Sequence, residues 1–351
     1  MRSIFQTLLM LGIMLLSVVG SAQAQSKWLR THIDGQDYVK LSDVWRYYGF
    51  SKTQGRTGFL AYGAGNRVVS LRPSRQDFYV NDYRYVLSFP VQEREGQLYI
   101  STVDMEKLVD PVLRPRLAAS RDFNTVVLDP GHGGHDAGAR SRYAVEKDCN
   151  LSLALKVRDK LRKAGFKVVM TRDSDFFLTL GQRVVIANQT PNSIFVSIHH
   201  NSDAGKGTAY GIETFTLAPH GTTSPFARTR RTEDLMGNHQ DSENIALATA
   251  VHSHAIKRTS AFDRGIQRAR FSVLCTIQRP AILFEGGFVT HPREGSKISS
   301  SEYQNLLAQC ICEGIMRYKA TAKGSGVATR NSTPPPRATS VRISGSKTPT
   351  R

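Results

Sequence analysis

The chain has 351 residues, of which 40% are hydrophobic, and a formal net charge of +18 at pH 7. This hydrophobic share supports a packed core, which excludes a largely disordered chain, and the length is enough for one large domain and a smaller one. The charge alone is compatible with binding either to nucleic acid or to the anionic polymers and lipid head groups of a cell envelope.

The first residues follow the pattern of a secretory signal. Arg2 precedes an apolar run at 8–19, and Ala22 and Ala24 then provide a cleavage site. We expect residues 1–24 to be a signal peptide; a retained signal anchor is the alternative, which the short run and the cleavage site disfavour. No later run reaches the roughly 18 to 20 apolar residues of a membrane helix. Export argues against nucleic acid as a partner and favours anionic envelope polymers.

Residues 25–113 are predicted to form a small α+β domain. The sequence GQDYV at 35–39 returns as GQLYI at 96–100, and each copy should be a strand that runs into a short helix. The pattern at 80–109 loosely resembles the N-terminal domain of copper amine oxidases, a module also found on bacterial cell-wall enzymes. That resemblance implies a binding or spacer role without catalysis. The aromatic residues of this region are predicted to pack in its core rather than to stack on glycans: Tyr38, Trp45, Tyr47 and Tyr48.

Residues 114–122 are basic and proline-punctuated, and we expect an irregular linker there. The following domain, 123–320, alternates apolar runs with helical patterns. Strands are predicted from Thr125 and at 166–170, 194–198, 211–217 and 280–284, and helices at about 148–164 and 303–318. The strand at 211–217 alternates polar and apolar residues and is expected at an edge. This order predicts an α/β domain with a mostly parallel twisted sheet covered by helices on both faces.

Two segments depart from this rhythm. Residues 219–244 are polar and long for a connection, which is typical either of a lid or regulatory insert or of a surface loop. Residues 321–351 are basic, proline-containing and almost free of apolar residues, so we expect a disordered tail that tethers the protein to anionic envelope polymers. The cysteines are too few for a disulfide framework and are expected to be buried thiols: Cys149, Cys275, Cys310 and Cys312.

Four polar side chains come from the ends of predicted elements. His132 follows the first strand among glycines, His199 follows the strand at 194–198, and Glu285 ends the last strand. Glu146 precedes the first helix. Because parallel strands carry their carboxyl ends to one edge of a sheet, these side chains should converge there. Two histidines and one glutamate form a zinc ligand set that leaves a position for water, and the second glutamate can act as a base.

Two further histidines compete for roles at this edge. His200 is the rival of His199, but neighbours in extended chain point to opposite faces, so only one should reach the pocket. His135 is a candidate for contact with substrate or with a metal ligand.

Six sequence stretches between 125 and 318 resemble the zinc-dependent N-acetylmuramoyl-L-alanine amidases of bacterial cell-wall turnover: LDPGHGGHDAGA, VEKDCNLSLA, TLGQRVVIAN, SIHHNS, FDRGIQRARFSVL and AILFEGGFVTHP. The resemblance implies that His132, Glu146 and His199 are the zinc ligands and that Glu285 is the catalytic carboxylate. By the same match, Arg183 and Asn188 are either structural or site-supporting residues, and Asn201 lines the site. His200 departs from the family, which usually has a small residue there, so it either alters the pocket floor or contacts substrate.

The resemblance implies hydrolysis of the amide bond between N-acetylmuramic acid and L-alanine in peptidoglycan, with one zinc ion. The alternatives are a zinc peptidase that acts within the stem peptide and a non-catalytic cell-wall-binding regulator, although the intact ligand set argues against the regulator. We expect an exported bacterial protein, periplasmic or bound to the cell wall, with peptidoglycan as its partner and room for an activator protein.

Overall fold

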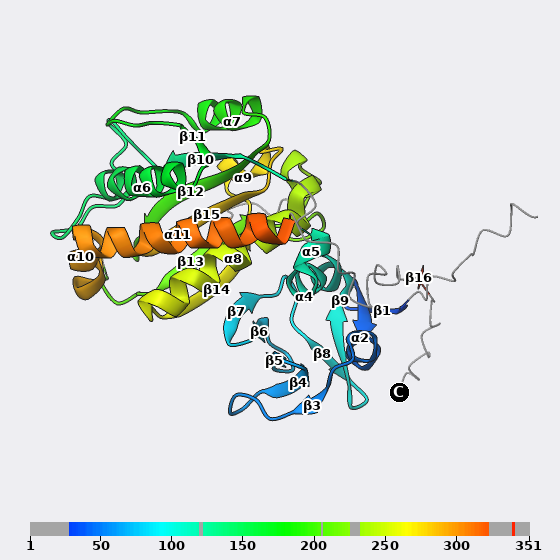
Figure 1. The fold of residues 1–351 in the computed structure, drawn as a ribbon. Coiled ribbons are helices and arrows are strands. Elements are labelled where there is room, and N and C mark those ends of the chain that lie inside the picture. The colour runs from blue at the N-terminus through cyan, green and yellow to red at the C-terminus, as the bar shows by residue number, and fades with distance from the viewer. Residues whose placement is uncertain (1–27, 119–121, 205, 225–231, 323–338, 341–351) are drawn as a thin grey trace, which may run out of the picture.

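The computed structural model describes residues 28–118, 122–204, 206–224, 232–322 and 339–340 (Figure 1). The expected signal peptide and nearly all of the expected basic tail therefore lie outside the described residues. Among the helices in these ranges, none combines the length and apolar character needed to cross a membrane. The strands form one 11-stranded sheet, in the order β11-β10-β12-β15-β13-β14-β7-β6-β5-β4-β3, and one five-stranded sheet, in the order β16-β1-β2-β9-β8.

The C-terminal part of the large sheet is mostly parallel, as predicted. Its strands are β10 (Thr125–Pro130), β11 (Lys167–Met170), β12 (Ser193–Asn201), β13 (Ile212–Leu217), β14 (Asp263–Ala269) and β15 (Ala281–Phe288). Neighbouring strands are parallel except β13 and β15, which are antiparallel. The carboxyl ends of β10, β12 and β15 therefore meet at one edge, which we call the catalytic edge.

Helices cover both faces of this sheet, which confirms the predicted α/β class (Figure 1). They are α6 (Glu146–Lys163), α7 (Leu180–Gln189), α8 (Asp241–Thr259), α9 (Ser272–Cys275), α10 (Pro292–Ile298) and α11 (Ser301–Ala322). Alternate residues of β10 pack to opposite sides: Val126 and Leu128 join the core under α6, α8 and α11, whereas Val127 joins the core under α7 and α9. The helix expected from about 148 begins at Glu146, so this carboxylate lies in its first turn.

The prediction of β13 as an edge strand is wrong. β13 lies between β15 and β14, and all six of its residues are buried. Two of its polar side chains find partners inside the protein: the carboxylate of Glu213 accepts a hydrogen bond from Gln267, and the hydroxyl group of Thr214 lies 3.0 Å from Nδ1 of the buried His252. The alternation of polar and apolar residues in β13 therefore reflects internal hydrogen bonding rather than exposure to solvent.

The N-terminal strands divide between the two sheets. They are β1 (Leu29–Ile33), β2 (Gln36–Lys40), β3 (Ser51–Thr53), β4 (Leu60–Ala64), β5 (Arg67–Leu71), β6 (Asp77–Val80), β7 (Tyr83–Val86), β8 (Gln92–Arg94) and β9 (Gln97–Ser101), and β16 (Thr339–Ser340) pairs with β1. The two repeat copies are β2 and β9, which pair with each other and run into α2 (Leu41–Tyr48) and α3 (Thr102–Asp104). Tyr38 and Trp45 are buried, Trp45 belongs to the large core, and Tyr47 and Tyr48 pack against that core, which confirms core packing of the aromatic residues.

The segment expected as an irregular linker is partly helical. It contains α5 (Pro115–Ala118), which directly follows a π-helix, η1 (Met105–Val109), and α4 (Asp110–Leu113) at the end of the preceding region. Proline is compatible with the first turn of a helix, where its missing N–H group would be unpaired anyway, so the prolines here start helices rather than interrupt the chain. Leu113 and Ala118 are buried in the large core.

The N-terminal strands and the C-terminal strands share one sheet. β7 lies beside β14 with Tyr85 opposite Ile266, and the backbone N–H of Arg84 donates to Asp263 at 2.9 Å. A buried ion pair also joins the two parts: Nη1 of Arg268 on β14 lies 3.1 Å from Oδ1 of Asp104 in α3. Strands β3 to β7 are therefore an extension of the large sheet, whereas β1, β2, β8 and β9 belong to the five-stranded sheet.

Candidate active site

His132 lies in a tight turn directly after β10. Its backbone has φ of 63°, and the next two residues, Gly133 and Gly134, also have positive φ. Gly131 has no room for a side chain, because a Cβ atom there would lie 2.0 Å from Cε1 of His199. The glycines thus allow the chain to reverse and let the two imidazole rings approach each other.

Two buried arginines hold this turn in place. Arg183 pairs with Asp129 at 2.7 Å and donates to the carbonyl groups of Pro130 and His132 at 2.8 and 2.7 Å. The structure therefore places Arg183 behind the site, where it supports the turn. Arg172, which the sequence did not mark, donates through Nε to Pro130 at 2.9 Å. It follows strand β11, and nothing in its spacing distinguishes it from an ordinary loop arginine.

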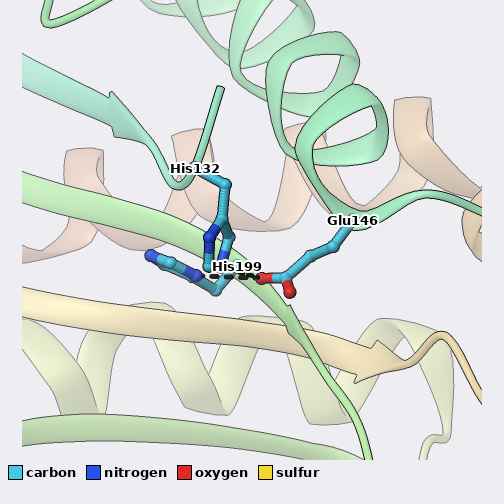
Figure 2. A group of neighbouring side chains, drawn as sticks. All are labelled: His132, Glu146 and His199. Atoms are coloured by element: carbon cyan, nitrogen blue, oxygen red, sulfur yellow. Dashed lines mark hydrogen bonds and ion pairs between the residues drawn. The ribbon is translucent and has the colours of Figure 1, made fainter. Parts of the chain in front are cut away.

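Three side chains converge at the catalytic edge, as Figure 2 shows. Oε1 of Glu146 lies 3.2 Å from Nε2 of His132 and 3.0 Å from Nδ1 of His199. One donor atom from each of these residues lies within 4.8 Å of the other two. This donor set has the composition and the spacing of a metal-binding site.

The charges in this cluster affect one another. Burial alone would raise the pKa of Glu146, but hydrogen bonds and charge interactions with His132 and His199 lower it well below the usual range. Burial alone would lower the pKa of His132, whereas its carboxylate neighbours raise it. The cluster therefore favours a carboxylate surrounded by positive charge, which a bound cation would also provide.

Neighbouring groups fix the orientation of these side chains. Asp136, which the sequence analysis missed, lies 2.8 Å from Nδ1 of His132 and so directs Nε2 toward the cluster. Its position four residues after His132 in the same glycine-rich motif was the available signal. The backbone N–H of Ala139 donates to Oε2 of Glu146 at 2.9 Å, and Asn150 donates to Oε1 at 3.3 Å.

Glu285 lies on β15 beside the cluster. It is opposite His199 in the parallel pair and opposite Glu213 in the antiparallel pair. Oε2 of Glu285 is buried and has no hydrogen-bond partner among the described residues. Burial, followed by the charges of Glu146 and Glu213, raises the pKa of Glu285 well above its usual value. Such a group is suited to taking up and returning a proton.

Asn201 and Glu213 belong to a polar network next to Glu285. Asn201 donates to Oε1 of Glu213, while Arg264 and Gln267 donate to its Oε2 at 3.2 and 2.5 Å. Asn201 thus contacts Glu213 rather than one of the three clustered ligands. The sequence analysis missed Glu213 and Arg264, because β13 was taken for an edge strand and β14 was not recognised as a strand.

His200 points away from the clustered ligands. Its side chain is 1% exposed, Nδ1 lies 2.8 Å from Oδ1 of Asn150, and burial lowers its pKa to about 4. A Cβ atom at Gly286 would lie 2.9 Å from Nε2 of His200. The glycine on β15 therefore makes room for the large side chain on β12. Of the two roles considered for His200, its burial favours packing below the pocket over contact with substrate.

The remaining predicted residues lie farther from the cluster. His135 is exposed, with its ring 4.2 Å from that of Phe177. Asn188 donates to the carbonyl of Thr276 at 2.9 Å and accepts from the N–H of Gln278 at 2.8 Å. Asn188 therefore links α7 to the chain after α9, on the sheet face that these two helices cover, and it supports the fold there.

The 219–244 segment follows the carboxyl end of β13, whereas Glu213 lies near the amino end of that strand. Arg270 anchors it by donating to the carbonyl groups of Pro219 and Glu233 at 3.1 and 2.9 Å. The segment then forms a 3-10 helix, η2 (Met236–Gln240), and the first turn of α8. Its residues 225–231 lie outside the described part of the chain. The described ends of this segment therefore lie at the sheet end opposite the catalytic edge, and a lid role stays an untested prediction.

Comparison with known proteins agrees with this geometry. The N-acetylmuramoyl-L-alanine amidase family matches residues 126–317. The uncharacterized protein YqiI of Bacillus subtilis is 34% identical over 194 residues, which cover 55% of this chain and 84% of YqiI. The amidase AmiA of Escherichia coli is 30% identical over 230 residues, which cover 58% of this chain and 79% of AmiA.

Among solved structures, an N-acetylmuramoyl-L-alanine amidase from Clostridium difficile 630 is 36% identical and covers 57% of this chain and 97% of its own, with a TM-score of 0.47. The family match spans more than half of the residues. It includes the three clustered ligands and the glutamate beside them: His132, Glu146, His199 and Glu285. The chain belongs to the N-acetylmuramoyl-L-alanine amidase family.

Proposed function

We propose that this protein is a zinc-dependent amidase that cleaves the bond between N-acetylmuramic acid and L-alanine in peptidoglycan. His132, Glu146 and His199 hold one zinc ion in this proposal, and Glu285 moves the proton. The observation that supports it best is the grouping of three ligand atoms within 4.8 Å beside a buried oxygen of Glu285 that has no partner within the described ranges.

The donor set suits zinc. Two imidazole nitrogens and one carboxylate oxygen are a common ligand set of zinc hydrolases, and three protein ligands leave a position for water. Asp136 fixes which nitrogen of His132 faces the cluster, as partners of zinc-binding histidines usually do. When bound, zinc would polarise the amide carbonyl and make water more acidic.

Glu285 supplies the acid–base chemistry. Its carboxylate lies next to the ligand set and can take the proton of an attacking water, and then deliver that proton to the departing alanine nitrogen. Burial, followed by the charges of Glu146 and Glu213, raises the pKa of Glu285, which makes its carboxylate a stronger base toward the attacking water. Arg183 and Asp129 keep the His132 turn rigid during this cycle.

The parts outside the catalytic edge have supporting roles in this proposal. Residues 25–113 serve as a binding or spacer module, 114–122 connect it to the catalytic domain of residues 123–320, and the basic tail at 321–351 holds the exported enzyme near anionic envelope polymers. Adding salt should weaken that attachment, whereas equal binding by a chain truncated after Ala320 would contradict it.

The test is incubation of residues 25–351 with intact peptidoglycan, with and without a zinc chelator, beside the Glu285→Ala variant. We expect free stem peptides that begin with L-alanine, identified by mass, and their loss in both controls. Zinc content should fall with His132→Ala but stay unchanged with Glu285→Ala. His239→Ala is the matched control for the histidine, because His239 is exposed in η2.

Other products would change the conclusion. Cleavage within the stem peptide would indicate a zinc peptidase. Binding without cleavage, also after addition of an envelope extract that could supply an activator protein, would indicate a cell-wall-binding regulator.

A further inference from the structure

Further charged side chains lie on the catalytic edge beyond Glu285, on the neighbouring strands β13 and β14. Glu285 on β15 lies opposite Glu213 on β13, and the next strand in the sheet, β14, carries Arg264. In an antiparallel pair, directly opposite residues share a face of the sheet, so Glu213 lies on the same face as Glu285. The guanidinium of Arg264 is tied to Glu213 through Nε at 3.2 Å. A fixed positive group therefore stands on the far side of Glu285 from the metal ligands.

The Nε atom of Arg264 is fixed by Glu213, whereas its side chain remains partly exposed to solvent. Its carbon Cζ lies 4.9 Å from the centre of the Phe288 ring, and Gly211 leaves space for its stem. Its side chain is 32% exposed, whereas that of Glu213 is 4% exposed. Within the described part of the chain, Nη1 and Nη2 of Arg264 donate to no protein group. Two parallel N–H donors that face solvent next to a catalytic carboxylate form a receptor for a planar anion.

The direction of the substrate follows from the chemistry of Glu285. The group that returns a proton to the leaving nitrogen must lie next to it, so the departing peptide extends on the Glu285 side of the metal ligands. Strands β15 and β14 are about 10 Å apart, two spacings of about 4.8 Å each. An extended peptide covers about 7 Å in two residues, and the arginine side chain reaches back toward it. The residue after L-alanine therefore falls within reach of Arg264.

We propose that Arg264 binds a free carboxylate of the stem peptide at the residue that follows L-alanine. This inference rests on the proposed amidase function and adds a specificity to it: the enzyme prefers stems in which this carboxylate is free over stems in which it is amidated. Glu213, Phe288 and Gly211 are the groups that keep the guanidinium in place.

The test compares two soluble disaccharide-peptides that differ only in whether the carboxylate of the residue after L-alanine is free or is a carboxamide. The wild-type enzyme should show a kcat/KM at least about 10-fold higher for the free carboxylate, because an arginine receptor loses its charged partner in the amide. Arg264→Gln should bring this ratio close to one, chiefly by lowering the value for the free carboxylate. Arg264→Lys, which keeps the charge but not the two parallel donors, should give an intermediate ratio.

Two controls separate binding from structural damage. Arg158→Gln removes a partly buried arginine of α6 that pairs with Asp159 at 2.8 Å, far from the catalytic edge in sequence, and should leave the ratio unchanged. Arg264→Gln also leaves Glu213 with one donor fewer, so the double variant Arg264→Gln with Glu213→Gln removes both charges together; it too should lose the preference.

Three results would overturn the inference: a wild-type ratio near one, an equal loss on both substrates in the Arg264 variants, or no cleavage of either peptide by an enzyme that releases stem peptides from intact peptidoglycan. Failure to release stem peptides from peptidoglycan itself would instead contradict the proposed function.

Discussion

Two buried acids in this protein have opposite surroundings. Asp104, at the junction between the N-terminal strands and β14, accepts hydrogen bonds from Ser88, Phe89, Ser101 and Arg268 at 2.6 to 3.1 Å. Glu285, at the catalytic edge, has one oxygen that no donor in the described part of the chain reaches, and two other carboxylates nearby. The first acid is fully paired by the fold, and the second is left for a proton, a substrate or a cation.

The difference separates structural charge from functional charge. A buried carboxylate normally costs free energy unless donors surround it, so evolution can leave one unpaired only where function uses it. Asp241 is intermediate: it is buried, accepts one hydrogen bond from Asn238 at 3.0 Å, and has Lys107 at 3.9 Å. The following four predictions test this comparison.

Glu285→Gln should have the largest effect on activity and almost none on the fold. We expect the rate to fall roughly 10²- to 10⁴-fold, because the variant can no longer accept a proton. Unfolding should not become easier, since the carboxylate that is removed has a buried oxygen without a donor. Rate assays, metal content and thermal unfolding measure the three quantities. A clear loss of thermal stability would show that Glu285 is paired in a way that the structure does not record.

Asp104→Ala should do the reverse. It leaves Arg268, whose side chain is 5% exposed, without its ion pair, so the free energy of unfolding should fall by about 3 to 5 kcal/mol. The zinc content and the kcat of the remaining folded protein should be close to those of the wild type. Denaturant titration gives the stability, and Asp82→Ala is the control because that side chain is 88% exposed. Equal stability of the two variants would contradict a structural role for the pair.

Asp241 should make stability depend on pH. Burial is the main cause that raises its pKa from 3.8 to about 6. The unfolded chain therefore loses this proton near pH 4 and the folded chain only near pH 6, so the contribution of Asp241 to the free energy of unfolding is largest below pH 4 and falls as the pH rises to 6. The shift in pKa corresponds to a loss of at most about 3 kcal/mol in the free energy of unfolding. The actual loss should be smaller, because the amino end of α8 favours the charged form of Asp241.

Asp241→Asn removes this dependence. The difference in unfolding free energy between wild type and variant should change between pH 4 and pH 6 and stay constant above that range. The exposed Asp234 provides the matched control in Asp234→Asn. A constant difference from pH 4 to pH 6 would mean that Asp241 ionises normally in the folded protein.

Asp136→Asn should give the smallest effect of the four. The variant still places an oxygen near Nδ1 of His132 but loses the negative charge, so zinc affinity should fall roughly 10- to 100-fold. Competition with a chelator measures this directly, and Asp159→Asn is a control, because the side chain of Asp159 is 57% exposed and pairs with Arg158 on α6. An unchanged affinity would show that the turn alone orients the histidine.

The metal-ligand candidates could be predicted from sequence because β10, β12 and β15 are apolar runs that end in a polar residue. The order of such strands fixes where their ends meet, whatever the details of packing. β14 was missed for a physical reason. Its sequence, DRGIQRA, contains three charged residues, and these are paired by groups distant in sequence, including Glu213 and Asp104. A periodicity argument takes such residues for exposed ones, and it therefore also missed Arg264 beside the site.

The shared sheet has a consequence for association between molecules. Edge strands are where one protein can pair with another, and β14 would be such an edge if β7 did not lie beside it. The sheet instead ends at β3, a strand of three exposed residues that includes Lys52. A short strand with a lysine offers an approaching chain few backbone groups and a repelling charge. Because β7 to β3 continue the sheet from β14, they replace a long edge strand by a short one that is less prone to intermolecular pairing and aggregation.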